Sequence, residues 1–303
     1  MRSSLPLGVL LYAIAIPAFA QNPDSAPIPE ITDPAAEIMR PHDDLDVKAS
    51  YAAPNSIHNS DHGGRPHTVY GSAEYVHQQP IARGVLLRTG VSWNRMDFGG
   101  TEAPIPGALQ STAAIVGVDV LTSGKLGFRI EARPGIYSDF EQVGWDDVDA
   151  RAIVAAEYRY SPNIRLIGGV RFTGMGEYPV LPIAGAAFKF TEKFSLDLIY
   201  PDLKFEYRPS DHWEWNLGIS FVSGSYRTHL SGIDDDDAEL RNAIVNYFES
   251  RPTLGVVYRG FAGIDLFANT GVAMGRKFDY FRAGKETIIG GAPFFELGLR
   301  ARF

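Results

Sequence analysis

Residues 125–136 read Lys-Leu-Gly-Phe-Arg-Ile-Glu-Ala-Arg-Pro-Gly-Ile, and this stretch decides the fold prediction. Apolar side chains occupy every second position from Leu126 onward, and the charged residues Arg129, Glu131 and Arg133 stand between them. A two-residue period is typical of a β-strand with one apolar and one polar face. The same period recurs over residues 149–160, 163–173 and many later runs, with almost no helical pattern. The sequence therefore predicts an all-β protein.

Two architectures produce this alternation, a soluble β-sandwich and a membrane β-barrel. Strands of soluble proteins are usually about five or six residues long. The runs here reach the roughly nine to eleven residues that a tilted strand needs to cross a bilayer. Aromatic residues such as Trp93, Phe98, Tyr137 and Trp213 lie near the expected strand ends, as interfacial girdles would require. We therefore expect a transmembrane antiparallel β-barrel with its apolar face toward lipid and its polar face toward the lumen.

The turn signals divide the chain into an even number of strands, as bacterial barrels require. Twelve is the count that the runs favour. In such a barrel, short turns should lie on one side of the membrane and long connections on the other. Residues 193–207 break this rule, because short turns flank that run at both ends. Splitting it at Pro201–Asp202 and adding a strand near 45–56 would give fourteen, which stays open. The twelve expected strands are 68–78, 83–95, 110–121, 125–136, 149–160, 163–173, 180–190, 193–207, 211–224, 243–258, 261–275 and 293–303.

The first 66 residues differ from the rest of the chain. Residues 1–20 combine Arg2, an apolar run and the small-x-small pattern ending at Ala20, which predicts a signal peptide for export. Residues 21–66 are rich in proline, so we expect a mostly disordered periplasmic tether. The alternation from Leu45 to Tyr51 would allow one extra strand within it. The barrel domain is expected over residues 67–303.

The chain ends in a run that places Phe295, Leu297, Leu299 and Phe303 on one face. A last strand that ends in phenylalanine resembles the C-terminal signature of bacterial outer-membrane barrels. This resemblance implies that Phe303 is an assembly signal read by the barrel assembly machinery. With the export signal, it places the protein in the outer membrane, in contact with its lipid and lipopolysaccharide. No oligomeric state is predicted.

Composition excludes several function classes. The 303 residues carry a formal net charge of -8, which argues against a nucleic-acid partner because phosphate contacts need a basic surface. The absence of cysteine excludes thiol catalysis and zinc-thiolate sites. We expect no cofactor and no bound metal.

Several short motifs resemble an uncharacterised family of bacterial outer-membrane β-barrels, a domain-of-unknown-function family. They are residues 133–140 (RPGIYSDF), 179–182 (PVLP) with Gly185, 200–201 (YP), 205–208 (FEYR) and 210–213 (SDHW). The resemblance covers most of residues 68–303 and implies an outer-membrane barrel. It implies no activity and no functional residues.

Charged residues on the face opposite the apolar one form the candidate site. Guanidinium and carboxylate groups can line a water-filled constriction and set the selectivity of a narrow passive channel for small polar solutes. The alternative is a structural or envelope-interaction barrel whose charges pair across strands and fill the lumen. The expected lumen-lining residues are Arg129, Glu131, Arg133, Arg151, Glu157, Arg159, Arg165, Arg171, Glu296 and Arg300.

Other polar clusters have simpler explanations. Asp234–Asp237 with Glu239 is an acidic run whose spacing does not match a calcium loop, so it reads as a solvated connection. His58, His62 and His67 with Asp61 lie in a Gly/Pro-flanked segment without a rigid scaffold for a metal.

An enzyme is the less favoured reading. Asp211–His212 could suggest the acid–histidine pair of an outer-membrane protease, but its place in a tight turn favours a turn role. A lipid-modifying enzyme would need a serine and a histidine close together, for which Ser223, Ser225 and His229 are the nearest candidates. Adjacency in sequence alone does not establish such a pair, so no catalytic residues are assigned.

Overall fold

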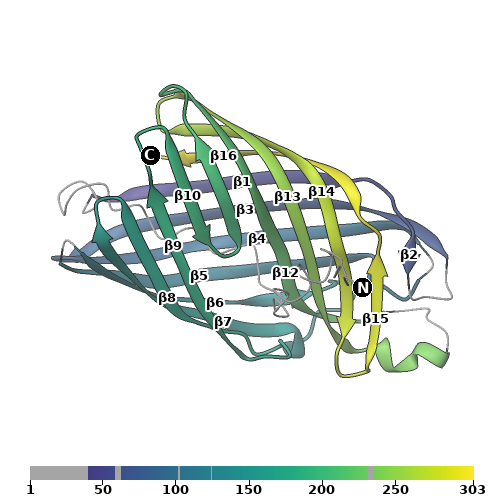
Figure 1. The fold of residues 1–303 in the computed structure, drawn as a ribbon. Coiled ribbons are helices and arrows are strands. Elements are labelled where there is room, and N and C mark those ends of the chain that lie inside the picture. Colours follow the sequence, from purple (N-terminus) through teal and green to yellow (C-terminus); the bar gives the residue numbers. More distant parts are fainter. Residues whose placement is uncertain (1–39, 59–62, 102, 124, 231–234) are drawn as a thin grey trace, which may run out of the picture.

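The computed structural model describes residues 40–58, 63–101, 103–123, 125–230 and 235–303. Fourteen strands form a closed antiparallel barrel in which neighbours in the wall follow chain order (Figure 1). β1 closes the ring, because it pairs with β16 on one side and with β3 on the other. The wall strands are β1 His42–Ala52, β3 Gly64–Ala82, β4 Val85–Thr101, β5 Ala108–Ser123, β6 Leu126–Ser138, β7 Val148–Ser161, β8 Ile164–Phe172, β9 Val180–Lys189, β10 Phe194–Ile199, β11 Asp202–Tyr207, β12 Trp213–Thr228, β13 Ala243–Phe261, β14 Ile264–Tyr280 and β16 Ala292–Arg302.

Four short elements accompany the wall. β15 (Lys285–Ile289) continues the line of β16 along the end of β14, and β2 (Ile57–His58) pairs with β15. Two 3-10 helices, η1 (Trp145–Asp147) and η2 (Asp235–Leu240), lie in the connections before β7 and β13. Within the ranges described, neither helix is long and apolar enough to span a membrane.

The count of twelve strands is wrong, and the alternative of fourteen is confirmed. The run predicted as one strand over 193–207 is split by a turn at Tyr200–Pro201 into β10 and β11. The second additional strand is β1, which lies inside the predicted tether of residues 21–66. The wall therefore begins at His42 rather than near residue 67. The predicted signal peptide and the tether up to residue 39 lie outside the described residues.

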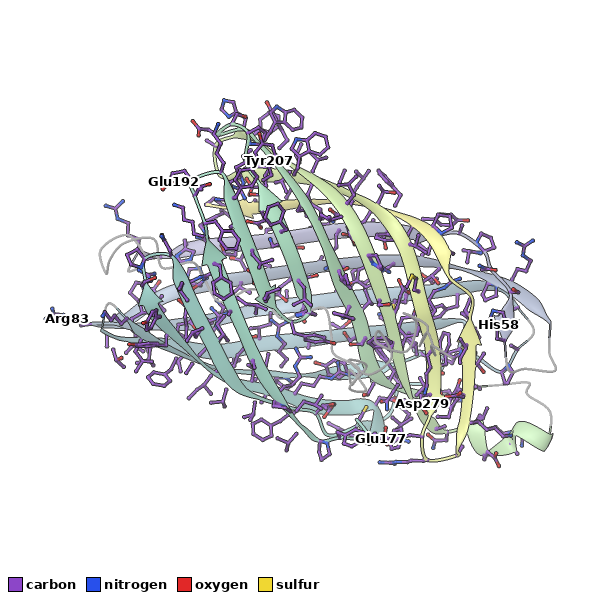
Figure 2. All side chains as sticks on the ribbon, viewed as in Figure 1. His58, Arg83, Glu177, Glu192, Tyr207 and Asp279 are labelled. Atoms are coloured by element: carbon purple, nitrogen blue, oxygen red, sulfur yellow. The ribbon has the colours of Figure 1, made fainter. Side chains whose placement is uncertain are left out.

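The two ends of the barrel differ in their connections. Arg83 and Glu192 mark short turns at one end, whereas His58, Glu177 and Asp279 mark longer connections at the other (Figure 2). We call the strand segments near the short turns the turn half and those near the long connections the loop half. Both chain ends of the described wall, His42 and Phe303, belong to the turn half, where Asp43 N–H donates to the Phe303 carbonyl at 2.8 Å.

In the turn half, the predicted sidedness of the strands is confirmed. The outward side chains Ile130 and Leu217 are 52% and 62% exposed, whereas the inward Arg129 and Glu131 are 5% and 4% exposed. Cross-strand register keeps this arrangement, because Arg129 pairs with Asp119 on β5 and Ile130 pairs with Val118. The apolar face of these strands is therefore on the outside of the barrel, and the charged face is on the inside.

In the loop half, the polarity of the two faces reverses. On β4, Arg95 and Asp97 point outward and pair with each other, whereas Met96 and Phe98 are buried inside. Tyr137 is also fully buried in this interior cluster, so the expected girdle role of Phe98 and Tyr137 is wrong. Trp93 and Trp213 remain exposed on the outer surface, as a girdle requires. Here β4 thus has the polarity of a strand in a water-soluble β-barrel, whereas Tyr51 and Val69 in register beside Asp97 stay apolar and exposed.

Candidate functional site: the barrel lumen

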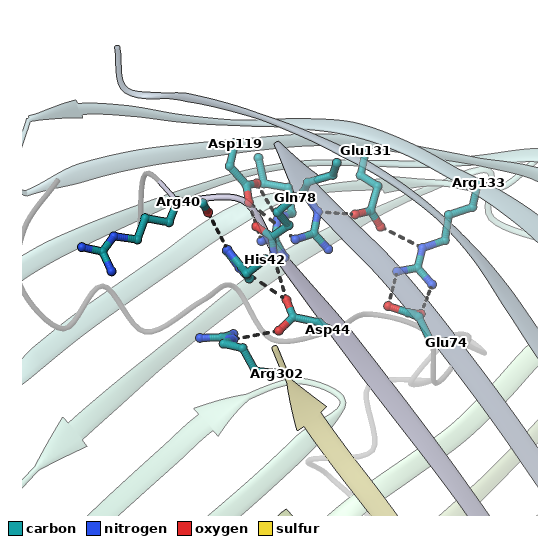
Figure 3. A network of polar contacts seen from close by, with 11 residues as sticks. Arg40, His42, Asp44, Glu74, Gln78, Asp119, Glu131, Arg133 and Arg302 are labelled. Carbon is teal, nitrogen blue, oxygen red and sulfur yellow. Dashed lines mark hydrogen bonds and ion pairs between the residues drawn. The ribbon is translucent and has the colours of Figure 1, made fainter. Parts of the chain in front are cut away.

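A buried ionic network occupies the lumen beside β3–β6. Arg88 Nε donates to Glu131 Oε2 at 3.0 Å, and Arg133 Nε donates to Glu131 Oε1 at 2.8 Å. Arg133 also reaches Glu74 on β3 at 2.7 Å, so this network crosses the inner face of several strands (Figure 3). Arg129 forms a paired contact with Asp119 at 2.7 and 2.8 Å. The predicted residues Arg129, Glu131 and Arg133 therefore lie together with their charges paired, as a buried ion network requires.

The predicted luminal residues of β7 and β8 are less uniform. The guanidinium of Arg151 lies 3.5 Å from the centre of the Tyr137 ring and donates to the Ser225 carbonyl at 2.5 Å. Glu157 pairs with Arg165 at 3.6 Å. Arg171 is buried and lines the luminal cavity, and Arg159 is half-buried near the turn end. Arg151 therefore supports the loop half, Arg165 and Arg171 line the cavity, and Glu157 is buried behind Arg165.

The predicted residues of the last strand lie at different depths. Glu296 accepts from Asn269 at 2.8 Å and lies 3.5 Å from Arg251. Arg300 pairs with Asp46 on β1 at 3.0 Å, and its side chain is half exposed at the turn end. Phe303 is exposed beyond the strand. Its role as an assembly signal stays a prediction.

Among the charged residues of the lumen that the sequence reasoning missed, four are almost completely buried. Arg88 is one, and the fully buried pair of Glu249 and Arg251 on β13 is another two. Strict alternation along β4 and β13 could have found these three. Arg276 could not be found in this way, because a bulge at Gly275 (φ 61°) switches which residues of β14 face inward.

An apolar cluster lies inside the barrel at the loop end of the lumen. The end of β12 crosses to the opposite wall, where Arg227 forms a parallel bridge with Ser138 of β6. Inside, Tyr226 donates to Asn94 Oδ1 of β4 at 3.2 Å, and Phe98 packs against Phe278 with ring centres 4.8 Å apart. In the ranges described, the cluster comprises Tyr70, Met96, Phe98, Ile105, Leu109, Ala113, Tyr137, Met175, Val222, Tyr226, Leu230, Leu240, Ala243, Ile244, Val245, Tyr247, Phe278, Tyr280 and Ile289.

The wall is incomplete between β9 and β12. β10 and β11 have six residues each, and Figure 1 shows that they end well short of β9 and β12. Among the described residues, β9 pairs with β10 only from Ala187 to Lys189, and β12 pairs with β11 only up to Ser220. We call this interruption, bounded by residues 180–186 of β9 and by β12 from Val222 onward, the wall gap.

A luminal cavity of about 230 Å³ reaches the wall gap. Its lining near the gap is mostly apolar and includes Ile183, Ile199, Pro201, Phe221 and Val222. Its deeper lining is ionic and includes Arg129, Glu131, Arg165, Arg171, Asp197, Lys204, Glu214, Arg251, Glu296 and Arg300. Six predicted residues of the lumen thus meet in one cavity with the residues of the β10–β11 turn, namely Arg129, Glu131, Arg165, Arg171, Glu296 and Arg300.

The remaining polar candidates do not converge on this cavity. Glu239 of the acidic run pairs with Lys285 at 3.0 Å, and Asp234 lies outside the described residues. His58 and His67 lie on β2 and β3, whereas Asp61 and His62 are not described. His212 lies in the β11–β12 turn.

The serine and histidine of the lipid-enzyme hypothesis have different partners. The Ser225 hydroxyl donates to Asn246 Oδ1 at 2.7 Å, whereas the His229 ring faces Asp139 and Asp147. Ser223 is fully buried. The contacts therefore give no support to a serine–histidine pair.

Comparison with solved structures gives distant likenesses to outer-membrane channels. An outer membrane channel from Pseudomonas putida F1 is 12% identical, with a TM-score of 0.47 and coverage of 89% of this chain and 99% of the other. The toluene transporter TodX of Pseudomonas putida is 12% identical, covers 90% and 92%, and has a TM-score of 0.39. The toluene transporter TbuX of Ralstonia pickettii is 9% identical, covers 90% and 92%, and has a TM-score of 0.40. These similarities are too low to transfer a solute or a mechanism.

The sequence itself defines the relationship more clearly. None of the curated proteins matches the chain significantly. Residues 123–300, which are more than half of the chain, match one family over the region from β6 to β16. The resemblance to a domain-of-unknown-function family is thereby confirmed. The chain belongs to the family described as Domain of unknown function (DUF6268).

Proposed function

We propose that the protein is a passive outer-membrane channel for small, largely apolar molecules, which move between the luminal cavity and the membrane through the wall gap. The observation that carries this proposal is the cavity of about 230 Å³ that reaches the wall where strand pairing is interrupted. Closed barrels have no free strand edges, so an interruption in the wall marks a special site.

The outer surface of the turn half supports a membrane location. Exposed apolar side chains encircle it, among them Val91, Val116, Leu254, Leu266 and Leu297. A continuous apolar surface of this extent would be unfavourable in water. On β9, exposed apolar residues run from Val180 to Phe190 just beyond its end, so the gap beside Val180 faces the same apolar zone. Export by the predicted signal peptide and contact with lipopolysaccharide and the assembly machinery remain predictions.

The chemistry of the cavity favours an apolar or amphipathic solute over the small polar solutes expected from the sequence. The lining at the gap is formed by Ile183, Ile199 and Phe221, which would receive an apolar group without desolvating a charge. A route straight through the barrel would have to pass the apolar cluster at the loop end.

The test is uptake of the uncharged aromatic dye N-phenyl-1-naphthylamine by cells that do or do not produce the protein. Ile183→Trp fills the inner edge of the gap, whereas Ala184→Trp adds the same ring on the outward face of the same strand. We expect expression to speed uptake, Ile183→Trp to slow it severalfold, and Ala184→Trp to leave it unchanged. Uptake that expression does not alter, or that both variants alter equally, contradicts the proposal.

Liposome swelling distinguishes the polar-channel alternative. Proteoliposomes in small sugars should swell no faster than protein-free vesicles if the loop end stays closed. Rapid, size-dependent swelling that Ile183→Trp leaves unchanged would instead identify an end-to-end polar pore. A barrel with a filled lumen would change neither the rate of dye uptake nor the rate of liposome swelling.

A further inference from the structure

A carboxylate–histidine cluster lies at the loop end, outside the luminal cavity. We propose that Asp146, Asp147 and His229 bind one divalent transition-metal ion, with zinc as the favoured ion, and that Asp139 orients the histidine. One ligand atom from each of the three residues lies within 4.8 Å of the others. Asp146 and Asp147 belong to η1, and His229 directly follows β12.

Asp147 provides the first indication of a missing partner. Its side chain is fully buried, and its Oδ2 accepts a hydrogen bond from the Gly144 backbone N–H at 2.7 Å. In the described part of the chain, its Oδ1 has no hydrogen-bond partner. A buried carboxylate oxygen without a partner is costly, so an unfilled position of this kind points to a ligand.

The distance from Asp147 to His229 fits a shared ion. His229 Nε2 lies 3.8 Å from Asp147 Oδ1, which is too long for an N–H···O hydrogen bond. Zinc binds imidazole nitrogen and carboxylate oxygen at roughly 2.0–2.2 Å, so two such ligand atoms of a tetrahedral site lie about 3.3–3.5 Å apart, and a closure of a few tenths of an ångström would let these two atoms share an ion. The geometry leaves room for the ion between the two side chains.

Asp139 holds the histidine in the required orientation. The other ring nitrogen of His229, Nδ1, lies 3.4 Å from Asp139 Oδ1, and the His229 backbone N–H donates to Asp139 Oδ2. Asp139 is itself buried. A carboxylate behind a metal-binding histidine fixes the ring and raises its basicity, so Nε2 is directed toward Asp147.

Asp146 supplies the third carboxylate and solvent access. Its side chain is half exposed, and Arg227 Nε lies 3.5 Å from its Oδ2. Its ligand oxygen lies within 4.8 Å of the ligand atoms of Asp147 and His229. A small movement of this exposed side chain would therefore bring it onto the ion. One imidazole and two carboxylates suit zinc, with water in the fourth position.

The cluster joins segments that are distant in sequence, which is why spacing did not reveal it. Asp139 is 90 residues from His229. The bridge between Ser138 of β6 and Arg227 of β12 brings the two connections together. A bound ion would therefore link opposite sides of the wall at the loop end.

The experiment is calorimetric titration of the full chain in detergent with Zn²⁺ after treatment with EDTA. We expect one ion per chain in the wild type. His229→Ala and Asp147→Asn should weaken binding by more than about 100-fold, because each removes a ligand, and Asp139→Asn by about 10- to 100-fold. His212→Ala, at the opposite end of the barrel, should bind like the wild type.

A second measurement keeps the test independent of folding defects. Co²⁺ added to the stripped protein should produce visible d–d absorption that Zn²⁺ abolishes, and Asp147→Asn, which preserves side-chain shape, should remove the absorption. The proposal is overturned if the wild type shows no saturable binding at one ion per chain. Binding that His229→Ala, Asp147→Asn and Asp139→Asn all leave unchanged would overturn it too.

Discussion

The turn half and the loop half of the barrel share most of their strands, but along β4 the two faces exchange polarity between the halves. On β4, Arg88 is buried inside the turn half and Val91 is exposed outside it. A few residues later, Phe98 is buried inside the loop half and Asp97 is exposed outside it. One continuous strand therefore serves two environments, and the surroundings of the outer face decide which side chains the inner face holds.

The difference shows how each half is stabilised. In the loop half, burial of Phe98, Tyr247 and Phe278 removes apolar surface from water, as in the core of a soluble protein. In the turn half, the outward apolar residues gain from an apolar surrounding, so the interior can hold paired ions such as Arg88 and Glu131. Three pairs of substitutions test this division, given in order of expected effect.

The largest effect is expected from Glu131→Ala in the turn half. It leaves the buried Arg88 and Arg133 without a shared acceptor, which should lower the free energy of unfolding by about 3–5 kcal/mol. Lys277→Ala removes a charge on the outer surface of the loop half and should cost about 1 kcal/mol or less. Urea unfolding followed by tryptophan fluorescence measures both, and equal losses would contradict the division.

The second effect concerns the apolar interior of the loop half. Leu109→Ala should lower the free energy of unfolding by about 2–5 kcal/mol, because Leu109 is fully buried and a cavity would remain. Val116→Ala on the same strand is the control, since Val116 is 52% exposed on the outside of the turn half. In detergent, Val116→Ala should have little effect. A small loss for Leu109→Ala would show that the loop half does not rely on its core.

The smallest of the three effects tests the outer surface in a lipid bilayer. Leu217→Arg introduces a charge into the apolar zone of β12 and should cost about 2–4 kcal/mol if this zone lies at the bilayer midplane. The reverse exchange, Arg95→Leu in the loop half, removes the ion pair with Asp97 and the hydrogen bond to Gln110, both on the partly exposed outer surface, and should cost about 1 kcal/mol or less. Refolding equilibria in lipid vesicles measure the two values, and similar costs would place both sites in one environment.

The sequence predicted the turn half well because alternation there reports directly on sidedness. The run around Phe128 and Arg129 placed each residue on the correct face. The final strand also occupies almost the range predicted, Ala292–Arg302. The β10–β11 hairpin escaped the main count because two strands of only six residues each resemble one long run. The outward residues change from even positions such as Phe194 and Leu198 to odd positions such as Phe205 and Tyr207 at the turn, and the parity of the turns was the signal that indicated the split.

The loop half and the candidate sites depend on contacts that local pattern does not contain. Phe98 and Arg88 lie on the same face of the alternating pattern. The pattern alone therefore does not distinguish a Phe98 buried in an apolar core from a Phe98 at the membrane interface. The closure of the loop end depends on the crossing of β12 to β6, which joins Arg227 and Ser138. His229 was singled out as a partner for serine, but its neighbours Asp139 and Asp147 became apparent only through this crossing.

The short β10–β11 hairpin also affects the mechanics of the barrel. A complete ring of backbone hydrogen bonds resists widening, because any expansion must break hydrogen bonds between two neighbouring strands. Where β10 and β11 end, this ring is interrupted: in the described part of the chain the β9–β10 ladder stops at Ala187, and beyond it the end of β10 at Leu198 and Ile199 packs against Gly185 without strand pairing. Breathing motions of the wall should therefore concentrate along this seam, where a passing molecule would need the wall to yield.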